Sequence, residues 1–275
     1  MSQSNAAERT RLERAADALL GSGRVVFSLA IIALGTETLV CARSVDDSPI
    51  FSPRYRVIPV IPWLPAIPWL AYVFGAALVI CGAGLLSKHT VRTAALALGS
   101  LFFACTLILD VPKNAANIGS MSLRTGVFEP FALAALAWLF PGASATQSWL
   151  ARGSRYLLGV SLIVFGVDHL IALVPIATLI PVWIPWHVFW IGFFGAGFIT
   201  AGVSIGLNVL HRWGAAGIGL MFGIWVVTLH LPRVLGLYGI PGAPQNPNEW
   251  SSLFIAIALW GGPWAMAANE EAIAR

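Results

Sequence analysis

Long apolar stretches alternate with short polar ones along this chain, and their lengths predict eight membrane-spanning helices. An α-helix rises about 1.5 Å per residue, so about 20 apolar residues cross a hydrocarbon layer of about 30 Å. The predicted helices occupy residues 24–42, 67–87, 91–110, 127–141, 155–174, 187–208, 213–231 and 250–268. The fourth stretch is short for a crossing, which leaves an earlier start open. The pattern is typical of an all-α, polytopic membrane protein.

The composition favours a membrane protein over a soluble one. The chain is 58% hydrophobic and only 10% charged, whereas soluble domains carry roughly 25% charged residues. Its Lys and Arg residues lie mostly in short loops, as membrane topology requires, so the net charge of +4 does not indicate a nucleic-acid partner. Cys41, Cys81 and Cys105 have no metal-binding spacing and are typical of small apolar fillers.

Loop charge also predicts the orientation of the chain. Of the 16 Lys and Arg residues, ten fall on the side of the termini and six on the other side. Because basic loops stay inside, we expect an inner-membrane protein with both termini in the cytoplasm. Residues 1–23 favour an amphipathic cytoplasmic segment on the anionic leaflet, or a plain solvated start to the first helix. We expect residues 269–275 to form a short cytoplasmic tail. The lipid bilayer is the first partner that the sequence implies for the protein.

The two halves of the chain repeat one another. LILDVPK at 107–113 returns as VTLHLPR at 227–233, 120 positions later, with His230 in the place of Asp110. GRVVFSLAIIALGTETLV at 23–40 likewise matches SRYLLGVSLIVFGVDHLI at 154–171. We predict two four-helix repeats, at 24–145 and 150–268. Each has an even number of spans, so the repeats share one orientation and form two parallel four-helix bundles, a pseudo-dimer.

These repeats resemble the DoxX/DoxX-like family of four-helix membrane proteins. The resemblance rests on GTETL and GVDHL in the first helices, on PWLP and PVWIP before the second helices, and on FGAALVICGAGLL and FGAGFITAG within them. It covers both halves, roughly residues 24–140 and 155–265. The family includes subunits linked to thiosulfate:quinone oxidoreduction, members of oxidative-stress complexes and a receptor-assembly chaperone. The resemblance therefore implies a doubled four-helix unit and a link to redox chemistry.

Ionisable residues gather near the outer ends of the predicted helices. A charge at the bilayer centre costs roughly 2.5–3.5 kcal/mol on insertion scales, so the depth of such residues is informative. The catalytic candidates are Glu37, Asp168, His169, Asp110 and His230. The binding-pocket candidates are Glu129, Glu249, Arg233, Lys113 and Arg124. The offset of 120 places Glu249 on Glu129, as it places His230 on Asp110.

Two interpretations fit these positions. In the functional one, each repeat has an outward-facing pocket lined by the acid of its first helix, the ionisable group of its third and the glutamate of its fourth. Such a pocket suits proton exchange with a quinol-like or other small molecule. In the structural one, the helix-end groups reach interfacial water or form ion pairs, and Glu37, Asp168 and His169 bond neighbouring helices. A metal at His169, His187 and His230, with Asp168 and Glu249, has suitable residue types but no established spacing.

Three classes of function remain open. The first is a membrane component of a quinone- or thiol-linked redox system, which implies a quinone as cofactor and another redox protein as partner. The second is a binding or transport protein for a small lipophilic molecule. The third is a scaffold or assembly factor without chemistry. The residues do not decide whether the protein is an enzyme.

Overall fold

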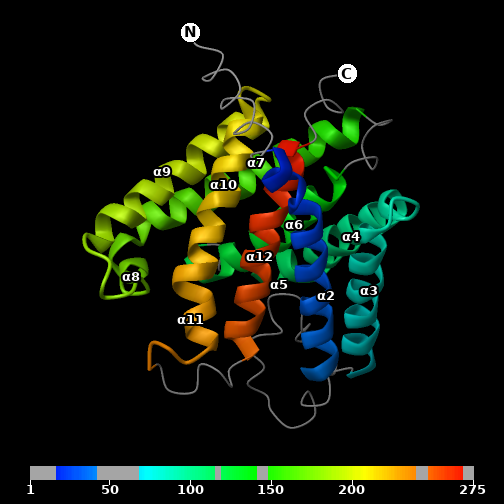
Figure 1. The fold of residues 1–275 in the computed structure, drawn as a ribbon, viewed down its shortest axis with the longest axis horizontal. Coiled ribbons are helices and arrows are strands. Elements are labelled where there is room, and N and C mark those ends of the chain that lie inside the picture. The colour runs from blue at the N-terminus through cyan, green and yellow to red at the C-terminus, as the bar shows by residue number, and fades with distance from the viewer. Residues whose placement is uncertain (1–16, 42–67, 115–118, 141–147, 240–246, 269–275) are drawn as a thin grey trace, which may run out of the picture.

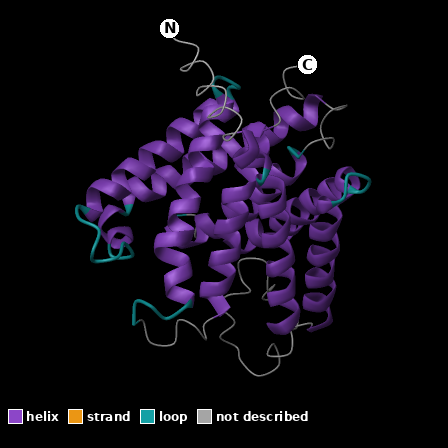
Figure 2. Cartoon of the chain, in the orientation of Figure 1, coloured by secondary structure: helices purple, strands orange, loops and turns teal. Residues whose placement is uncertain are grey.

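The structure is a computed structural model that describes residues 17–41, 68–114, 119–140, 148–239 and 247–268. Every regular element within these ranges is a helix (Figures 1 and 2). Seven helices of this part of the chain are long and apolar enough to cross a membrane. The prediction of an all-helical fold is thus confirmed for the described residues, and seven of these helices, against eight predicted spans, have the length and apolar character of membrane spans. The tail at 269–275 and most of the predicted cytoplasmic segment at 1–23 lie outside the described residues.

The main helices follow the apolar stretches of the sequence. In chain order they are α2 (Gly23–Cys41), α3 (Pro68–Leu86), α4 (Val91–Cys105), α6 (Met121–Trp138), α7 (Ser148–Ile171), α9 (His187–Gly206), α10 (His211–Trp225) and α12 (Pro247–Ala268). Shorter elements extend or connect them: the π-helices η3 (Thr106–Asp110) and η5 (Val226–His230), and α5 (Val111–Asn114), α8 (Leu173–Ala177) and α11 (Leu231–Val234).

Helix α6 is the main helix that is not among the seven candidate spans. It has 18 residues and contains Arg124, Glu129 and Pro130. The residues from 132 to 137 each expose at most 1% of their surface, so protein surrounds this part of the helix. A helix enclosed by protein can carry charged residues that a lipid-facing helix cannot. Its early start at Met121 explains why the fourth apolar stretch looks short in the sequence.

The main helices pack in a closed order that joins the two halves of the chain. Helix α2 packs on α3, α3 on α4 and α4 on α6, while α7 packs on α9, α9 on α10 and α10 on α12. Two contacts close the order: α6 packs on α7, and α12 packs on α2 (Figure 1). The last helix of each half therefore lies against the first helix of the other half. One continuous core contains residues from both halves.

Glycines bring the first two helices of each half into close contact. A Cβ atom on Gly166 of α7 would lie 2.5 Å from the carbonyl oxygen of Gly195 on α9. A Cβ atom on Gly35 of α2 would lie 2.7 Å from the carbonyl oxygen of Gly75 on α3. Lipid supplies little hydrophobic drive between helices, so such small-residue contacts carry much of the association.

Gly166→Ala should lower the free energy of unfolding by about 1–3 kcal/mol, because the backbone of α9 must move away from the new methyl group. Gly153→Ala, in the same helix, should raise it by roughly 0.5–1 kcal/mol, since alanine favours the helix and nothing lies within 4 Å of that Cβ position. Reversible unfolding of both variants in detergent micelles measures the difference. Equal effects of the two substitutions would contradict a close α7–α9 contact.

The repeated segment with the exchanged ionisable residue forms a π-helix in each half. Pro112 and Pro232 lack an N–H, and a proline ring clashes with the carbonyl four residues earlier in an α-helix. The helix widens just before each proline: the N–H of Val111 donates to the carbonyl of Thr106 five residues back, and Leu231 does the same to Val226. Asp110 and His230 end the two π-helices.

A tyrosine completes the hydrogen bonding of the second π-helix. In a regular α-helix the carbonyl of Thr228 accepts from residue 232, but Pro232 has no N–H to give. The hydroxyl of Tyr238 donates to this carbonyl instead. A buried carbonyl without a donor is costly, so this bond stabilises the widened turn that positions His230.

Candidate functional site

A cavity of about 640 Å³ is lined by residues of the main helices α6, α7, α9, α10 and α12 and of the shorter elements α8, η5 and α11. Six of the ionisable residues singled out in the sequence line it: Glu129, Asp168, His169, His230, Arg233 and Glu249. Apolar and aromatic side chains form much of the remaining wall, among them Phe165, Phe198, Phe222, Trp225 and Leu229. An apolar wall with a few polar groups is the usual composition of a small-molecule site.

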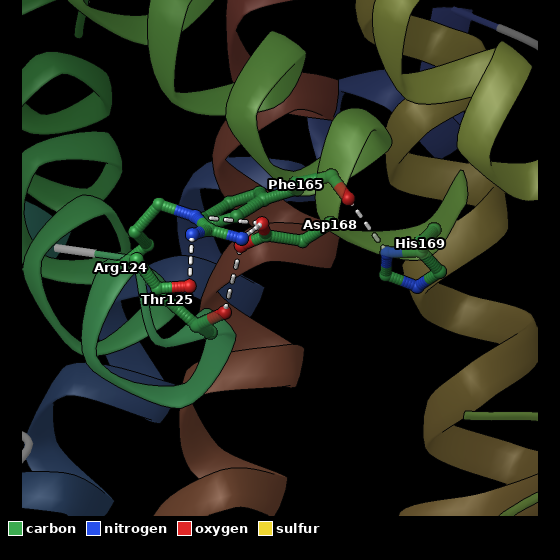
Figure 3. A network of polar contacts seen from close by, with 6 residues as sticks. Arg124, Thr125, Phe165, Asp168 and His169 are labelled. Carbon is green, nitrogen blue, oxygen red and sulfur yellow. Dashed lines mark hydrogen bonds and ion pairs between the residues drawn. The ribbon is translucent and has the colours of Figure 1, made fainter. Parts of the chain in front are cut away.

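Helix α7 places Phe165, Asp168 and His169 on one face, because residues three and four positions apart are neighbours on a helix. The Nδ1 atom of His169 lies 2.7 Å from the carbonyl oxygen of Phe165 (Figure 3). A carbonyl only accepts, so Nδ1 donates and Nε2 is the acceptor of the neutral imidazole. The ring of Phe198 packs against the imidazole with centroids 5.1 Å apart. His169 thus combines a fixed ring orientation with one nitrogen open to a proton or a hydrogen-bond donor.

An ion pair between Arg124 and Asp168 joins the two halves. The Nε atom of Arg124 donates to Oδ1 of Asp168 at 2.8 Å, and Nη2 donates to the same oxygen (Figure 3). The hydroxyl of Thr125 lies 3.5 Å from Oδ2, and Nη1 of Arg124 donates to the carbonyl of Gly119 at 2.7 Å. Asp168 is 2% exposed. The guanidinium occupies Oδ1 and the Thr125 hydroxyl lies near Oδ2, which favours the structural interpretation for Asp168.

Glu37 makes a related contact between the other pair of packed helices. The hydroxyl of Ser251 on α12 donates to Oε2 of Glu37 on α2 at 3.0 Å. Thr125 on α6 faces Asp168 on α7 in the same way. Glu37 and Asp168 match in the sequence at an offset of 131. Each first helix thus carries an acid that bonds a hydroxyl of the last helix of the other half.

The last helices of the two halves align at an offset of 126 in the structure, not 120. Thr125 and Ser251 are 126 positions apart. An added Cβ on Gly99 would meet Trp138, and one on Gly219 would meet Trp264, which gives the same offset. The extra six residues fall between α11 and α12, where residues 235–246 correspond to 115–120. Glu129 and Glu249 are therefore not equivalent, although the sequence offset of 120 aligns them.

A second ion pair closes one side of the cavity. The Nε atom of Arg233 donates to Oε2 of Glu249 at 2.8 Å, and Nη2 donates to Oε1 at 2.5 Å. Two parallel bonds of this kind fix a guanidinium and a carboxylate in one plane. This pair is of the kind that the structural interpretation of the sequence expected for the residues at the helix ends. It also places a charged, hydrogen-bonding group beside His230 on the cavity wall.

The other predicted residues whose side chains the structure describes are not part of this cavity's lining. Glu37 bonds Ser251, and Asp110 is buried at the end of η3, 3% exposed. Arg124 bonds Asp168 but does not itself line the cavity. The side chain of Lys113 lies outside the described part of the structure. His187 lines a separate surface concavity with Trp186 and Phe189. The prediction of one pocket per half thus differs from this cavity, since Glu129 reaches it from the first half.

The structure does not gather a metal site among the residues that it describes. No three His, Cys, Asp or Glu side chains in that part of the chain lie close enough to hold an ion together. His187 is in another concavity from His169 and His230. The three cysteines are all unbridged and half-buried.

The aromatic part of the cavity wall was missed in the sequence. Phe165, Phe198 and Phe222 pack in a row, with centroids 6.0 Å apart for the first pair and 5.6 Å for the second. Trp225 follows Phe222 by one turn of α10 and also lines the cavity. The corresponding residues of the first half are Leu34, Leu78, Phe102 and Cys105. Three of the four rings thus replace smaller side chains of the first half, and this exchange is the signal that distinguishes the halves.

No protein-family model, curated protein sequence or solved structure matches this chain. The cavity and its chemistry therefore carry the functional argument.

Proposed function

We propose that this membrane protein binds a small lipophilic molecule with an oxygen-bearing head group and exchanges protons with it. The observation that carries this proposal is a single cavity in which aromatic side chains face His169, His230, Glu129 and the Arg233–Glu249 pair. Apolar walls accept a ring, and the polar groups orient its oxygen atoms. A quinone or quinol is the class of ligand that fits both properties.

The residues that line the cavity have different roles in this proposal. His169 has Nε2 as an acceptor, so it receives a proton from a hydroxyl group of the ligand. Arg233 and Glu249 supply a donor and an acceptor for the second oxygen. Oxidation of a quinol to a quinone releases two protons and two electrons. The cavity accepts the protons, and a partner redox protein accepts the electrons, as in a quinone-linked membrane system.

The finer description of the fold is part of the same proposal. We infer a tandem duplication of a DoxX-like four-helix unit, with eight helices in two repeats of one orientation. It is supported by the equal lengths of α4 and α10, of η3 and η5 and of α5 and α11, each 120 positions apart. The excess of basic residues in the loops on one side supports cytoplasmic termini in an inner membrane.

A binding assay with a soluble quinone tests this function. A tailless dimethoxy-methyl-benzoquinone should bind the purified protein in lipid nanodiscs saturably, as followed by quenching of tryptophan fluorescence. His230→Ala should weaken this binding by roughly tenfold, the effect of one lost hydrogen bond to the ligand. Asp110→Asn, at the matched position of the first half, should leave it within about twofold. Absence of saturable binding, or equal effects of the two variants, would refute the proposal.

A scaffold or assembly role is the third class of function that the sequence left open. It predicts that His230→Ala and wild type support the same cellular function as long as both fold. The binding assay separates this role from ligand binding, because a scaffold needs no saturable site for a small molecule.

A further inference from the structure

A second hollow lies on the outer face of the helix pair α9 and α10, and it has a volume of about 560 Å³. Its walls are almost wholly apolar and include Phe193, Leu220 and Ile224, which are 56%, 56% and 43% exposed. Both helices are candidate membrane spans, so this face meets lipid in a bilayer. We call this hollow the α9–α10 groove.

The polar groups of the α9–α10 groove are already used. The Thr200 hydroxyl donates to the carbonyl of Ala196 at 3.0 Å, and the Ser204 hydroxyl donates to the carbonyl of Val209 at 2.6 Å. Neither hydroxyl has its proton left for a ligand. The groove therefore suits hydrocarbon rather than a polar head group.

Glycines make the groove. Gly217 has no heavy atom within 4 Å of its Cβ position. A Cβ on Gly197 would meet only the Sδ atom of Met221, at 3.7 Å. Because these two glycines have no side chains, the α9–α10 groove stays open between the side chains on either side of it.

The groove and the central cavity share one thin wall. Met221 lines the groove, and its neighbour Phe222 lines the cavity. Phe194 lines the groove and packs against Trp225, which lines the cavity, with ring centroids 5.1 Å apart. The linings of the two spaces are thus in direct contact. Methionine is the most adaptable apolar side chain, so this wall can yield by rotation of Met221.

We propose that the α9–α10 groove binds the hydrocarbon tail of the molecule whose head group lies in the central cavity. This proposal rests on the proposed function. The cavity offers hydrogen-bonding groups for the head of an amphipathic ligand, and the groove offers only apolar surface for its tail. The tail passes through the wall at Met221, beside the Phe194–Trp225 pair, and the ligand reaches its site from the bilayer.

Two ligands that share a head group test the tail site. The tailless benzoquinone and its decyl-tailed analogue are titrated into wild type and variants in the same nanodiscs, so that partition into lipid cancels. Gly217→Trp fills the groove at a position with open space and should weaken decyl-quinone binding by roughly tenfold. Tailless binding should stay within about twofold of wild type. Thr200→Trp, from the other wall, should give the same result.

The first half supplies matched controls. Ala97 and Ile80 precede Gly217 and Thr200 by 120 positions and are exposed on α4 and α3. Ala97→Trp and Ile80→Trp should leave the affinity for both quinones unchanged. Unchanged decyl-quinone affinity in Gly217→Trp and Thr200→Trp, with tailless binding intact, would overturn the tail site and leave the proposed function standing. Failure of both quinones to bind wild type would overturn both.

Discussion

Arg124→Ala should lower the free energy of unfolding by about 3–5 kcal/mol, the usual cost of leaving a buried charge without its partner. Asp168 is 2% exposed, and Arg124 bonds it through both Nε and Nη2. Without the guanidinium, the hydroxyl of Thr125 is too long a contact, at 3.5 Å, to replace these bonds. Unfolding in mixed micelles of wild type and variant measures the loss.

A double variant tests whether the unpaired charge is the cause. Arg124→Gln combined with Asp168→Asn removes both charges and keeps two hydrogen-bonding amides in place. It should recover more than half of the stability lost in Arg124→Ala. A double variant as unstable as the single one would show that the loss comes from packing rather than from the charge of Asp168.

Phe198→Ala should both destabilise the protein and abolish ligand binding. Phe198 is 3% exposed, and its ring packs against Phe165, His169 and Phe222. Loss of a buried phenyl ring costs about 3–5 kcal/mol. The aromatic wall then loses its middle ring, and the imidazole of His169 loses the neighbour that limits its motion.

Leu78→Ala is the matched control for this prediction. Leu78 lies 120 positions earlier, on α3, and is fully buried. Its loss should cost about 2–5 kcal/mol while tailless benzoquinone binding remains at the wild-type affinity. The measurement is a titration at a temperature where both variants are folded. Equal loss of binding in the two variants would mean that Phe198 acts through global stability alone.

Hydropathy predicted most of the fold because most helices face lipid on one side. Helices α2 and α9 begin within one residue of the predicted starts. Helix α6 was placed least well: it begins at Met121, six residues before the predicted 127, because its first turn carries the charged Arg124. Burial within protein permits this charge, and a hydropathy pattern cannot distinguish that environment from a loop. The prolines at 112 and 232 were visible in the repeat, but the π-helices before them were not predicted.

The sequence indicated part of the cavity lining. Asp168, His230 and Glu249 were expected to share a pocket, and all three line one cavity. Glu129 was assigned to the first half because identical residues aligned at an offset of 120. The longer connection before α12 moves that helix by six positions, and only its packing reveals the shift. Helix exchange between the halves then brings Glu129 to the cavity of the second half, which no local sequence pattern indicates.

The packing of α6 and α12 against the first helix of the opposite half has a consequence for how the molecule assembles. Each first helix has one neighbour from its own half and one from the other half: α2 packs on α3 and α12, and α7 packs on α9 and α6. The polypeptide must be synthesised almost to its end before α2 acquires its neighbour α12. The contact between α2 and α12 therefore depends on the last helix of the described chain.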